Sequence, residues 1–547
     1  MNAKSLRAIK SRANKGNIAS RFQLFEMFQD GKDVELDLEQ AFEHLKKCTQ
    51  ELAFHEGDNI SAKHPLRLNS ISFYDFRRFG HLSFSPKTNL SVIIGNNGAG
   101  KSSILEGIAK AFSQINNNLI YRNASAQTLE PTDVRVGITG TAEIILRFDL
   151  GEGTRYQGKF VTASKGFTSN SATDLTELKS LSRLFRRVNE EGNKTLKQQL
   201  DLPLLAFYSV GRSQIKPQLT YNEAEFDMNS RLDVIDKSAI DGEGNVEDFL
   251  RWFIYADNLA NYGDFDRLDR IKSEVAAYKS ILDVHTESGA KEEHPLYGVY
   301  IERLSDMNAL EARLSQFDLS LELKRLKCVK DAVISSVETI SDIYIERATG
   351  KAKVMLINSG VSVNFRQASK GQQVYLALVA DIARRMAYLN VNLDNLLHGQ
   401  GIVLIDEVEL HLHPSWQQGV IERLQKTFPN IQFIITTHSP QVLANVKAEN
   451  IFIITPNGDD KFSLDHPHQA YGLTSNDILN EVMQPHSMQS LARNVVVEER
   501  LSNIHRLISE KKYDQATECI EELEIEINGE IPELVEAKLS IDLASWK

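Results

Sequence analysis

Eight consecutive residues have the types and spacing of a phosphate-binding loop. Glycines let successive backbone N–H groups turn inward around phosphate oxygens, Lys101 places a cation near the β- and γ-phosphates, and Ser102 offers a hydroxyl to Mg²⁺. An apolar strand pattern precedes the loop and a helix pattern follows it, so a helix N-terminus adds partial positive charge. With the adjacent Ser103, we expect the loop to bind ATP through Gly95, Asn96, Asn97, Gly98, Ala99, Gly100, Lys101 and Ser102.

Two acidic residues end a second apolar strand pattern, residues 402–405. Unpaired charge at the end of a buried strand is costly, so a structural role explains these acids poorly. We expect Asp406 to hold Mg²⁺ through its water shell and Glu407 to polarise the attacking water. His438 follows a third apolar strand pattern, residues 431–435, where it would suit a γ-phosphate sensor. Glu407 and His438 are therefore the predicted catalytic residues.

The elements that must position these side chains alternate between strands and helices. Further strands are expected within 66–94 and at 142–149, 204–208, 352–364 and 451–454, with helices between them. This alternation predicts an α/β fold with helices on the faces of a sheet. The stretch from about 240 to 345 is predicted to be mostly helical, with heptad-like spacing that begins at Leu304.

Composition and charge limit the class of protein. The 547 residues are 42% hydrophobic and 25% charged, with a formal net charge of −12 and a pI of about 5.7. An acidic chain binds polyanions poorly unless basic residues gather locally. No apolar run approaches the roughly 20 residues that span a bilayer. Three widely separated cysteines fit a reducing compartment, so we expect a cytoplasmic protein without a membrane segment.

These patterns predict five segments. Residues 1–62 are expected to form a helical hairpin similar to one Sel1-like (TPR-type) repeat, although an ordinary helical arm fits them equally. An ATPase head is expected in two lobes, 63–235 with the phosphate loop and 346–475 with the acidic strand and His438. A helical arm, 236–345, is inserted between the lobes. The tail, 476–547, is predicted to be helical, amphipathic and acidic.

The segment that precedes a predicted helix at 372–389 resembles the signature of ABC ATPases. Ser369, Gly371 and Gln372 stand in the matching places, while Lys370 replaces the first glycine. A serine and a glycine at a helix N-terminus make an anion site. The resemblance implies that this signature contacts the γ-phosphate bound to another copy of the chain. We therefore expect a homodimer or higher homo-oligomer that uses ATP and Mg²⁺.

Other residues are assigned by the same resemblance, now to SMC-like ABC ATPases. The segment from Val408 to Pro414 matches the D-loop, although the spacing of its two histidines also suits a metal site. Arg78 and Phe79 resemble the basic and aromatic residues that cover the base and ribose, while Phe79 fits a core position equally. Two candidates remain for the Q-loop glutamine, Gln127 and Gln214.

The distance between the phosphate loop and the signature indicates which branch of the ABC ATPases the chain resembles. From Ser102 to Ser369 the chain advances 267 positions (369 − 102), too many for a transporter domain and far too few for a chromosome-condensing SMC arm. With the segments G-N-N-G-A-G-K-S, D-E-V-E-L-H-L-H-P and T-T-H-S-P-Q-V, the chain resembles the PtuA-like ATPases of Septu-type antiphage defence, in their retron-associated form. The fold implied is an SMC/RecF-like ABC head with a short helical insertion.

The Septu resemblance also implies partners. These are a PtuB-like HNH endonuclease, gated by ATP-driven head-to-tail dimerisation, and in retrons a reverse transcriptase with its RNA-linked DNA. Three alternatives stay open. One is a RecF-like repair ATPase that binds DNA directly, and another is a scaffold that binds ATP without turnover, given Lys370. The third is an OLD-like nuclease, for which residues 495–499 resemble a first element, although no D-x-D follows them.

The tail or the N-terminal hairpin is expected to dock a partner, because neither is needed to complete the nucleotide site. In the tail, apolar residues recur at helical spacing on an otherwise charged surface. Packing of this stripe onto the protein's own domain fits the pattern equally. The stripe consists of Ile504, Leu507, Ile508, Ala516, Ile520 and Leu523.

Overall fold

The computed structural model divides the chain into two compact units, Met1–Ile478 and Leu479–Lys547. The division lies close to the expected start of the tail at residue 476. The residues that the structure describes are 3–52, 64–122, 124–151, 153–169, 171–195, 200–213, 230–242, 246–261, 264–285, 294–315, 319–347, 352–458, 461–483, 495–527, 529 and 531–545.

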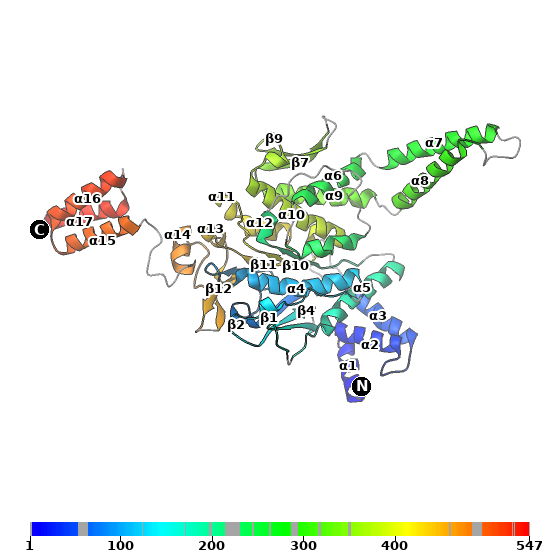
Figure 1. Cartoon of the computed structure of the whole chain (residues 1–547), viewed down its shortest axis with the longest axis horizontal. Coiled ribbons are helices and arrows are strands. Elements are labelled where there is room, and N and C mark those ends of the chain that lie inside the picture. Colours follow the sequence, from blue (N-terminus) through cyan, green and yellow to red (C-terminus); the bar gives the residue numbers. More distant parts are fainter. Residues whose placement is uncertain are drawn as a thin grey trace. The chain divides into compact units, whose positions relative to one another are not determined.

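A six-stranded sheet forms the centre of the first unit (Figure 1). Its strands are β3 (Leu90–Ile94), β6 (Leu204–Tyr208), β10 (Gly401–Ile405), β11 (Ile431–Thr436), β12 (Ile451–Pro456) and β13 (Phe462–Asp465). They lie in the order β13-β12-β3-β11-β10-β6, and every pair except β12–β13 is parallel. Four of them, β3, β6, β10 and β11, are buried at every residue, as strands covered on both faces should be.

This sheet unites segments that were expected in separate lobes. β6, from the first expected lobe, pairs with β10, from the second, and Tyr208 lies opposite Ile405. β3 lies between β11 and β12. The carboxyl ends of β3, β6, β10 and β11 therefore meet at one edge of the sheet, where ligands bind in open α/β folds. The predicted α/β head and its strands at 90–94, 204–208, 402–405, 431–436 and 451–454 are confirmed.

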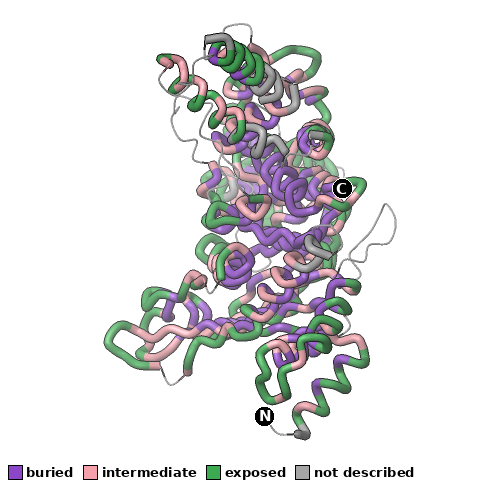
Figure 2. Tube along the Cα trace, turned by 90° about the vertical axis from the view of Figure 1, so that its right-hand side faces the viewer, coloured by how far each residue is buried: buried purple, intermediate pink, exposed green. Residues whose placement is uncertain are grey.

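A second, antiparallel sheet has the order β2-β1-β4-β5. Its strands are β1 (Arg67–Phe76), β2 (Phe79–Phe84), β4 (Thr141–Asp149) and β5 (Arg155–Ala163), and helix α4 (Lys101–Ile120) contacts both sheets. A Cβ atom on Gly107 of α4 would lie 2.6 Å from Phe73 Cε1, so the helix approaches β1 closely. Figure 2 shows that the buried residues are concentrated in these central layers.

The range expected to form the helical arm contains two kinds of helix. Its helices are α6 (Val246–Asn261), α7 (Asp264–His285), α8 (Tyr297–Ser315) and α9 (Leu319–Ser336). α6 and α9 pack in the body against α10 (Lys370–Leu389), and Trp252 of α6 is fully buried. α7 and α8 pack on each other, where Ile271 and Val275 meet Leu304 and Met307. Only α7 and α8 form the hairpin that extends from the body (Figure 1).

A small antiparallel sheet follows α9. Its strands are β7 (Ile340–Glu346), β8 (Lys353–Asn358) and β9 (Val361–Asn364). The stretch from about 240 to 345 is therefore mostly helical, as predicted, although its last residues form β7. Ile340 and Ile343 are buried, and with Ile345 they give β7 the β-branched residues that favour a strand.

Three helices begin the first unit, and they lie against its body. These are α1 (Ala3–Asn14), α2 (Ile18–Asp30) and α3 (Leu38–Leu52). Gly31 ends α2 in the left-handed conformation, with φ of 64°, and donates its N–H to Met27 O. α3 packs on α5 (Thr176–Thr195), and Arg183 of α5 forms an ion pair with Glu26 at 2.6 Å.

The second unit is a three-helix bundle of α15 (Val495–Ser509), α16 (Tyr513–Ile527) and α17 (Pro532–Ser545). Ile504, Ile520 and Leu523 of the predicted stripe are fully buried in its core, and Ala516 is buried as well. The stripe therefore packs within the tail itself, and its assignment as a partner surface is wrong. Residues 495–499 begin a helix, whereas the OLD-like alternative requires a strand there. That alternative is also wrong.

Short helices complete the first unit at the sheet's carboxyl edge and beyond. They are α11 (Pro414–Gln417), α12 (Val420–Thr427), α13 (Pro440–Leu443) and α14 (Ser475–Asp477). Among the helices of the described ranges, none combines the length and the apolar character needed to cross a membrane.

Candidate active site

The phosphate loop connects β3 to α4 and has the backbone that phosphate binding requires. Gly98 and Gly100 have φ angles of 74° and 98°, a region that suits glycine. Gly100 is constrained twice, because a Cβ atom there would also lie 2.4 Å from Phe79 Cζ. The buried Lys101 ammonium donates to Gly95 O at 2.9 Å and to Asn96 O at 3.2 Å. The loop thus holds its own lysine at the position where phosphate oxygens would bind.

Burial lowers the pKa of Lys101, and three carboxylates oppose that shift: Asp406, Glu407 and Glu409. These acids come from the end of β10, while Lys101 begins the helix after β3. The structure therefore brings the phosphate loop and the acidic strand together, as the sequence predicted. Ser102 is exposed beside Lys101, and a hydroxyl and a carboxylate are oxygen ligands that suit Mg²⁺.

Thr436, at the end of β11, holds the two acidic residues that follow β10. Its hydroxyl donates to Asp406 Oδ1 and accepts the backbone N–H of Glu407 at 2.8 Å. Asp406 is buried, while Glu407 is half-buried and has a φ angle of 46°. A positive φ turns the chain sharply after the strand, so the two neighbouring side chains take different directions. This separation suits one acid to a metal and the other to water.

Arg212 is a site residue whose role sequence reasoning missed. It lies just after β6 and is buried, and burial lowers its pKa to about 10. Its Nη1 donates to Ser209 O at 2.8 Å and to Asp406 O at 2.5 Å, and its Nη2 donates to Glu407 O at 2.6 Å. The guanidinium therefore ties the loop after β6 to the backbone that carries both acids.

His438 lies at the same edge of the sheet, in the turn after β11. Its backbone N–H donates to Glu409 Oε1 at 2.6 Å, and Glu409 Oε2 accepts the Thr437 hydroxyl at 2.7 Å. Burial lowers the pKa of His438, and the charge of Lys101 lowers it further. Lys101 and His438 therefore lie near each other, and Glu409 is a second site residue that the sequence reading did not single out.

Arg78 and Phe79 have different surroundings. Phe79 is fully buried beneath Gly100 and packs edge-on against Phe462 at 5.3 Å between ring centroids. A ring without an exposed face cannot stack on a base, so the assignment of Phe79 to base contact is wrong. Arg78 donates to Gly98 O, and its guanidinium lies 5.4 Å from the Phe462 ring centre. Arg78 and Phe462 both line a cavity of about 540 Å³ beside the phosphate loop.

Arg77 fixes the β1–β2 turn to the start of α4. Its Nε donates to Asp133 Oδ1 at 2.8 Å, and its Nη1 donates to Ser103 Oγ at 3.3 Å and to Glu106 Oε2 at 2.5 Å. Ser103 is thus engaged by a protein side chain. Its predicted contact with ATP stays a prediction.

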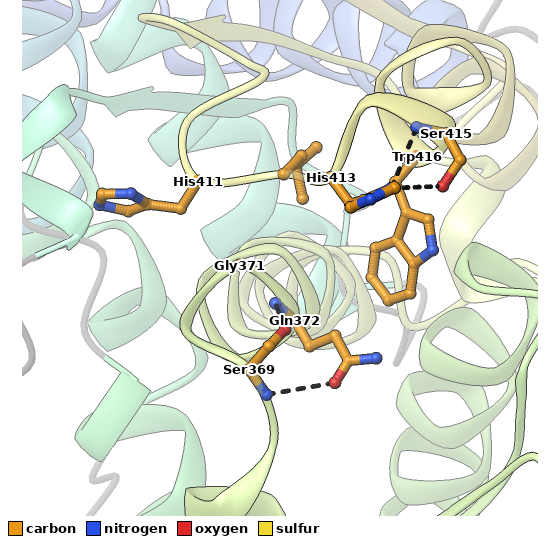
Figure 3. A pocket seen from close by; sticks show the side chains of 8 residues that line it. Ser369, Gly371, Gln372, His411, His413, Ser415 and Trp416 are labelled. Carbon is orange, nitrogen blue, oxygen red and sulfur yellow. Dashed lines mark hydrogen bonds between the residues drawn. The ribbon is translucent and has the colours of Figure 1, made fainter.

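The signature residues stand at the N-terminus of α10, against the D-loop segment (Figure 3). Ser369 caps the helix by accepting Gln372 N–H at 3.2 Å, and Gln372 Oε1 accepts the Ser369 N–H at 3.2 Å. A Cβ atom on Gly371 would lie 2.1 Å from His411 O, so only glycine allows this close approach. The predicted signature and D-loop are therefore in direct contact.

Beside this contact, residues of the signature and of the D-loop segment together line a cavity of about 240 Å³. Its lining residues are Ser369, Gly371, Gln372, His411, Leu412, His413, Ser415 and Trp416. None of them belongs to the phosphate loop. In Figure 3 the His411 ring points away from His413, which caps α11 and approaches Ser415 Oγ at 2.9 Å. Across the described residues, no three His, Cys, Asp or Glu side chains gather as a metal site.

Of the two candidates for the Q-loop glutamine, the structure places Gln127 away from the phosphate loop. Gln127 donates its backbone N–H to Ser113 Oγ at 2.8 Å. Ser113 lies twelve residues along α4 from Lys101, a helical rise of about 18 Å. Gln214 lies outside the described residues.

Comparison with known proteins gives matches over most of the chain. A family model described as "AAA domain, putative AbiEii toxin, Type IV TA system" matches residues 90–444. The "Retron Vc95 probable ATPase" of Vibrio cholerae serotype O1 biovar El Tor is 32% identical over 474 residues, 85% of this chain and 87% of that protein. The "Retron Ec83 probable ATPase" of Escherichia coli is 29% identical over 551 residues, 98% and 96% of the two chains. The "Septu protein PtuA" of Bacillus mycoides (strain KBAB4) is 32% identical over 142 residues, 26% of this chain and 19% of that protein.

Proposed function

Because the chain belongs to the AAA-domain family matched over residues 90–444 and is an ATPase of the retron and Septu type, we propose that it is the ATP-driven regulatory subunit of a bacterial antiphage defence system. One observation carries this proposal. Lys101, Asp406, Glu407 and His438, from three separate strand ends, meet at one edge of the sheet. This is the set of groups that nucleotide hydrolysis needs.

Each of these groups has a separate task in hydrolysis. The loop N–H groups and Lys101 bind and orient the phosphates. Ser102 and Asp406 would hold Mg²⁺, which neutralises charge on the β- and γ-phosphates. Glu407 accepts a proton from the attacking water, and the backbone turn held by Arg212 and Thr436 fixes its direction. His438, kept neutral by burial beside Lys101, offers a ring nitrogen to the γ-phosphate.

Two chains would complete each ATP site. Ser369 and Gly371 begin helix α10 and line the signature cavity, and such a helix N-terminus is suited to anions. In a head-to-tail dimer, the signature of one copy faces the γ-phosphate bound by the other. ATP binding would then close the dimer, and hydrolysis would open it.

The dimer would in turn control a nuclease. Residues 495–499, which the OLD-like alternative needs as a strand, begin helix α15 instead. The resemblance to Septu and retron ATPases supports an HNH endonuclease as the partner, with a reverse transcriptase and its RNA-linked DNA in the retron form. ATP state would decide whether the nuclease is held inactive or released.

The test is reconstitution with the HNH endonuclease of the same operon. The complex should copurify, and its nuclease activity should differ between the wild type and Glu407→Gln in the presence of ATP. Without nucleotide the two complexes should behave alike. Nuclease activity that is unaffected by the ATPase in every state would contradict the proposal. Tight binding of duplex DNA by the ATPase alone, without nuclease association, would favour the RecF-like alternative.

A further inference from the structure

The outer face of α17 carries apolar side chains that the tail core does not use. Val535, Leu539 and Leu543 are 40%, 56% and 71% exposed. They recur every four residues and therefore form one stripe along the helix. The end of α16 adds Ile525, which is 81% exposed. An apolar stripe of this length on an otherwise charged bundle marks an interaction surface.

The bundle is complete without this stripe. On the opposite face of α17, Leu534 and Ala537 are buried in the tail core, and Ile541 packs against it. α17 is therefore apolar on two faces, and α15 and α16 cover only one of them. Folding of the tail does not explain why the outer face is apolar, so its side chains can be changed without opening the core.

The surroundings of the stripe are strongly acidic. Residues 513–545 contain ten Asp and Glu residues and one basic residue, Lys538. Lys538 is itself paired with Glu524 at 2.5 Å. The helical period places Glu536 on one side of the stripe and Asp542 on the other, and both are exposed. An occupant must therefore bury apolar groups and face carboxylates on both flanks.

This charge decides between the possible occupants. A second copy of the tail would bring an equally acidic rim against this one, and like charges across an interface are costly. Residues 1–478 also carry a net negative charge. We infer that the α17 stripe docks a basic amphipathic helix of the nuclease partner. Leucines of that helix would pack against the stripe, and its Lys or Arg side chains would face Glu536 and Asp542. This inference rests on the proposed function.

The test compares two matched double variants of the full-length ATPase. Leu539→Ala with Leu543→Ala removes the stripe. Leu323→Ala with Val361→Ala removes two apolar side chains that are 44% and 62% exposed in the first unit, away from the N-terminal segment, and serves as the control. The Kd for the co-encoded HNH endonuclease should rise about tenfold or more for the first pair and stay unchanged for the control. High salt should weaken wild-type binding, because the rim charges are exposed.

A second pair, Glu536→Lys with Asp542→Lys, keeps the leucines and should also weaken the complex. This second pair still tests the docking surface if the two alanine substitutions unfold the tail. If wild type binds the nuclease and the stripe and rim variants bind it equally well, the docking surface is wrong and the proposed function survives. If wild type does not bind the nuclease, the proposed function fails and the inference fails with it. A change in the ATPase's own oligomeric state, with an unchanged nuclease Kd, would identify a second copy as the occupant and overturn the inference.

Discussion

The Arg212 side chain and the Glu407 backbone are 195 residues apart in sequence and 2.6 Å apart in space, from Nη2 to the carbonyl oxygen. Glu407 has a φ angle of 46°, and such a conformation costs on the order of 1–3 kcal/mol in a residue other than glycine. The guanidinium fork that holds the adjacent carbonyls offsets this cost. Arg212 is thus a positioning residue for the predicted base.

Arg212→Lys should lower kcat about 10- to 100-fold and leave KM for ATP nearly unchanged. An ammonium keeps the charge but cannot donate to several carbonyls in one plane, so Glu407 loses its fixed direction while the phosphate loop stays intact. Steady-state ATPase assays give both constants, and thermal melting shows whether the variant is folded. A rise in KM with normal kcat would place Arg212 in nucleotide binding instead.

Lys101→Ala should weaken ATP binding about 10- to 100-fold, because it removes the cation that faces the phosphates. Lys110→Ala is the matched control, since Lys110 lies on the same helix but bonds to Thr128 O and pairs with Asp133. Calorimetry with ATP measures both variants. Equal affinity of Lys101→Ala and wild type would mean that the loop does not bind the phosphates.

Glu407→Gln should retain ATP and slow hydrolysis about 10²–10⁴-fold, because the amide keeps the shape and loses the basic oxygen. The trapped nucleotide should also trap the closed dimer, which light scattering detects. Glu422→Gln, an exposed acid on α12, controls for the loss of one charge. Hydrolysis at the wild-type rate would assign the base to another residue.

Two inactive variants should regain ATPase activity when they are mixed, if each ATP site is built from two chains. Ser369→Arg places a bulky cation where the γ-phosphate would contact the signature, and Lys101→Ala removes phosphate binding. In a mixed dimer, one interface joins an intact phosphate loop to an intact signature. Part of the ATPase activity should therefore return on mixing. Absence of any rescue, with both variants folded and shown to co-assemble, would exclude a site built in trans.

The lowered pKa of His438 predicts a pH dependence of stability. The unfolded chain binds a proton at this histidine near the ordinary pKa of 6.5, and the folded protein binds it only at lower pH. The unfolded state therefore holds more protons in that window, and stability falls as pH drops below 6.5. His438→Gln should remove this component. The difference in Tm between wild type and variant should be constant above pH 6.5. Below pH 6.5, the Tm of the wild type should fall more than the Tm of the variant.

A pH-independent difference in Tm between the two proteins would show that His438 is not held neutral by its surroundings. His44→Gln offers a control. Burial lowers the pKa of His44 as well, although it lies on α3. Its effect on stability should resemble that of His438→Gln, whereas only His438→Gln should reduce ATPase activity.

The parts of the site that the sequence predicted are those with local patterns. The phosphate loop joins glycines to a lysine within eight residues, and Asp406 follows a strand that is apolar throughout. Such strands must lie in the middle of a sheet, so the residues at their ends were expected to meet. Long-range partners leave no comparable pattern. Nothing near Arg212 in sequence indicates that it bonds to the end of β10.

Other differences arose where periodicity has more than one physical meaning. The spacing of apolar residues from Ile504 to Leu523 correctly predicted amphipathic helices. Spacing alone does not say which surface covers the apolar face of a helix. Here the apolar faces of the tail helices cover each other. Phe79 follows two arginines, as a base-stacking residue could, yet Gly100 leaves room for its ring beneath the loop. The expected helical range includes most of β7, because Ile340 and Ile343 are three positions apart, a spacing that also suits one face of a helix.

The separate anchoring of α6 and α9 has a consequence for how such proteins diversify. Both ends of the α7–α8 hairpin are fastened in the body by helices that pack on α10, so the hairpin contributes no strand to the described sheets. Insertions or deletions between these anchors would alter how far the hairpin reaches while preserving the catalytic machinery. A change in the length or sequence of the hairpin would therefore leave the strand ends that carry the candidate site in place.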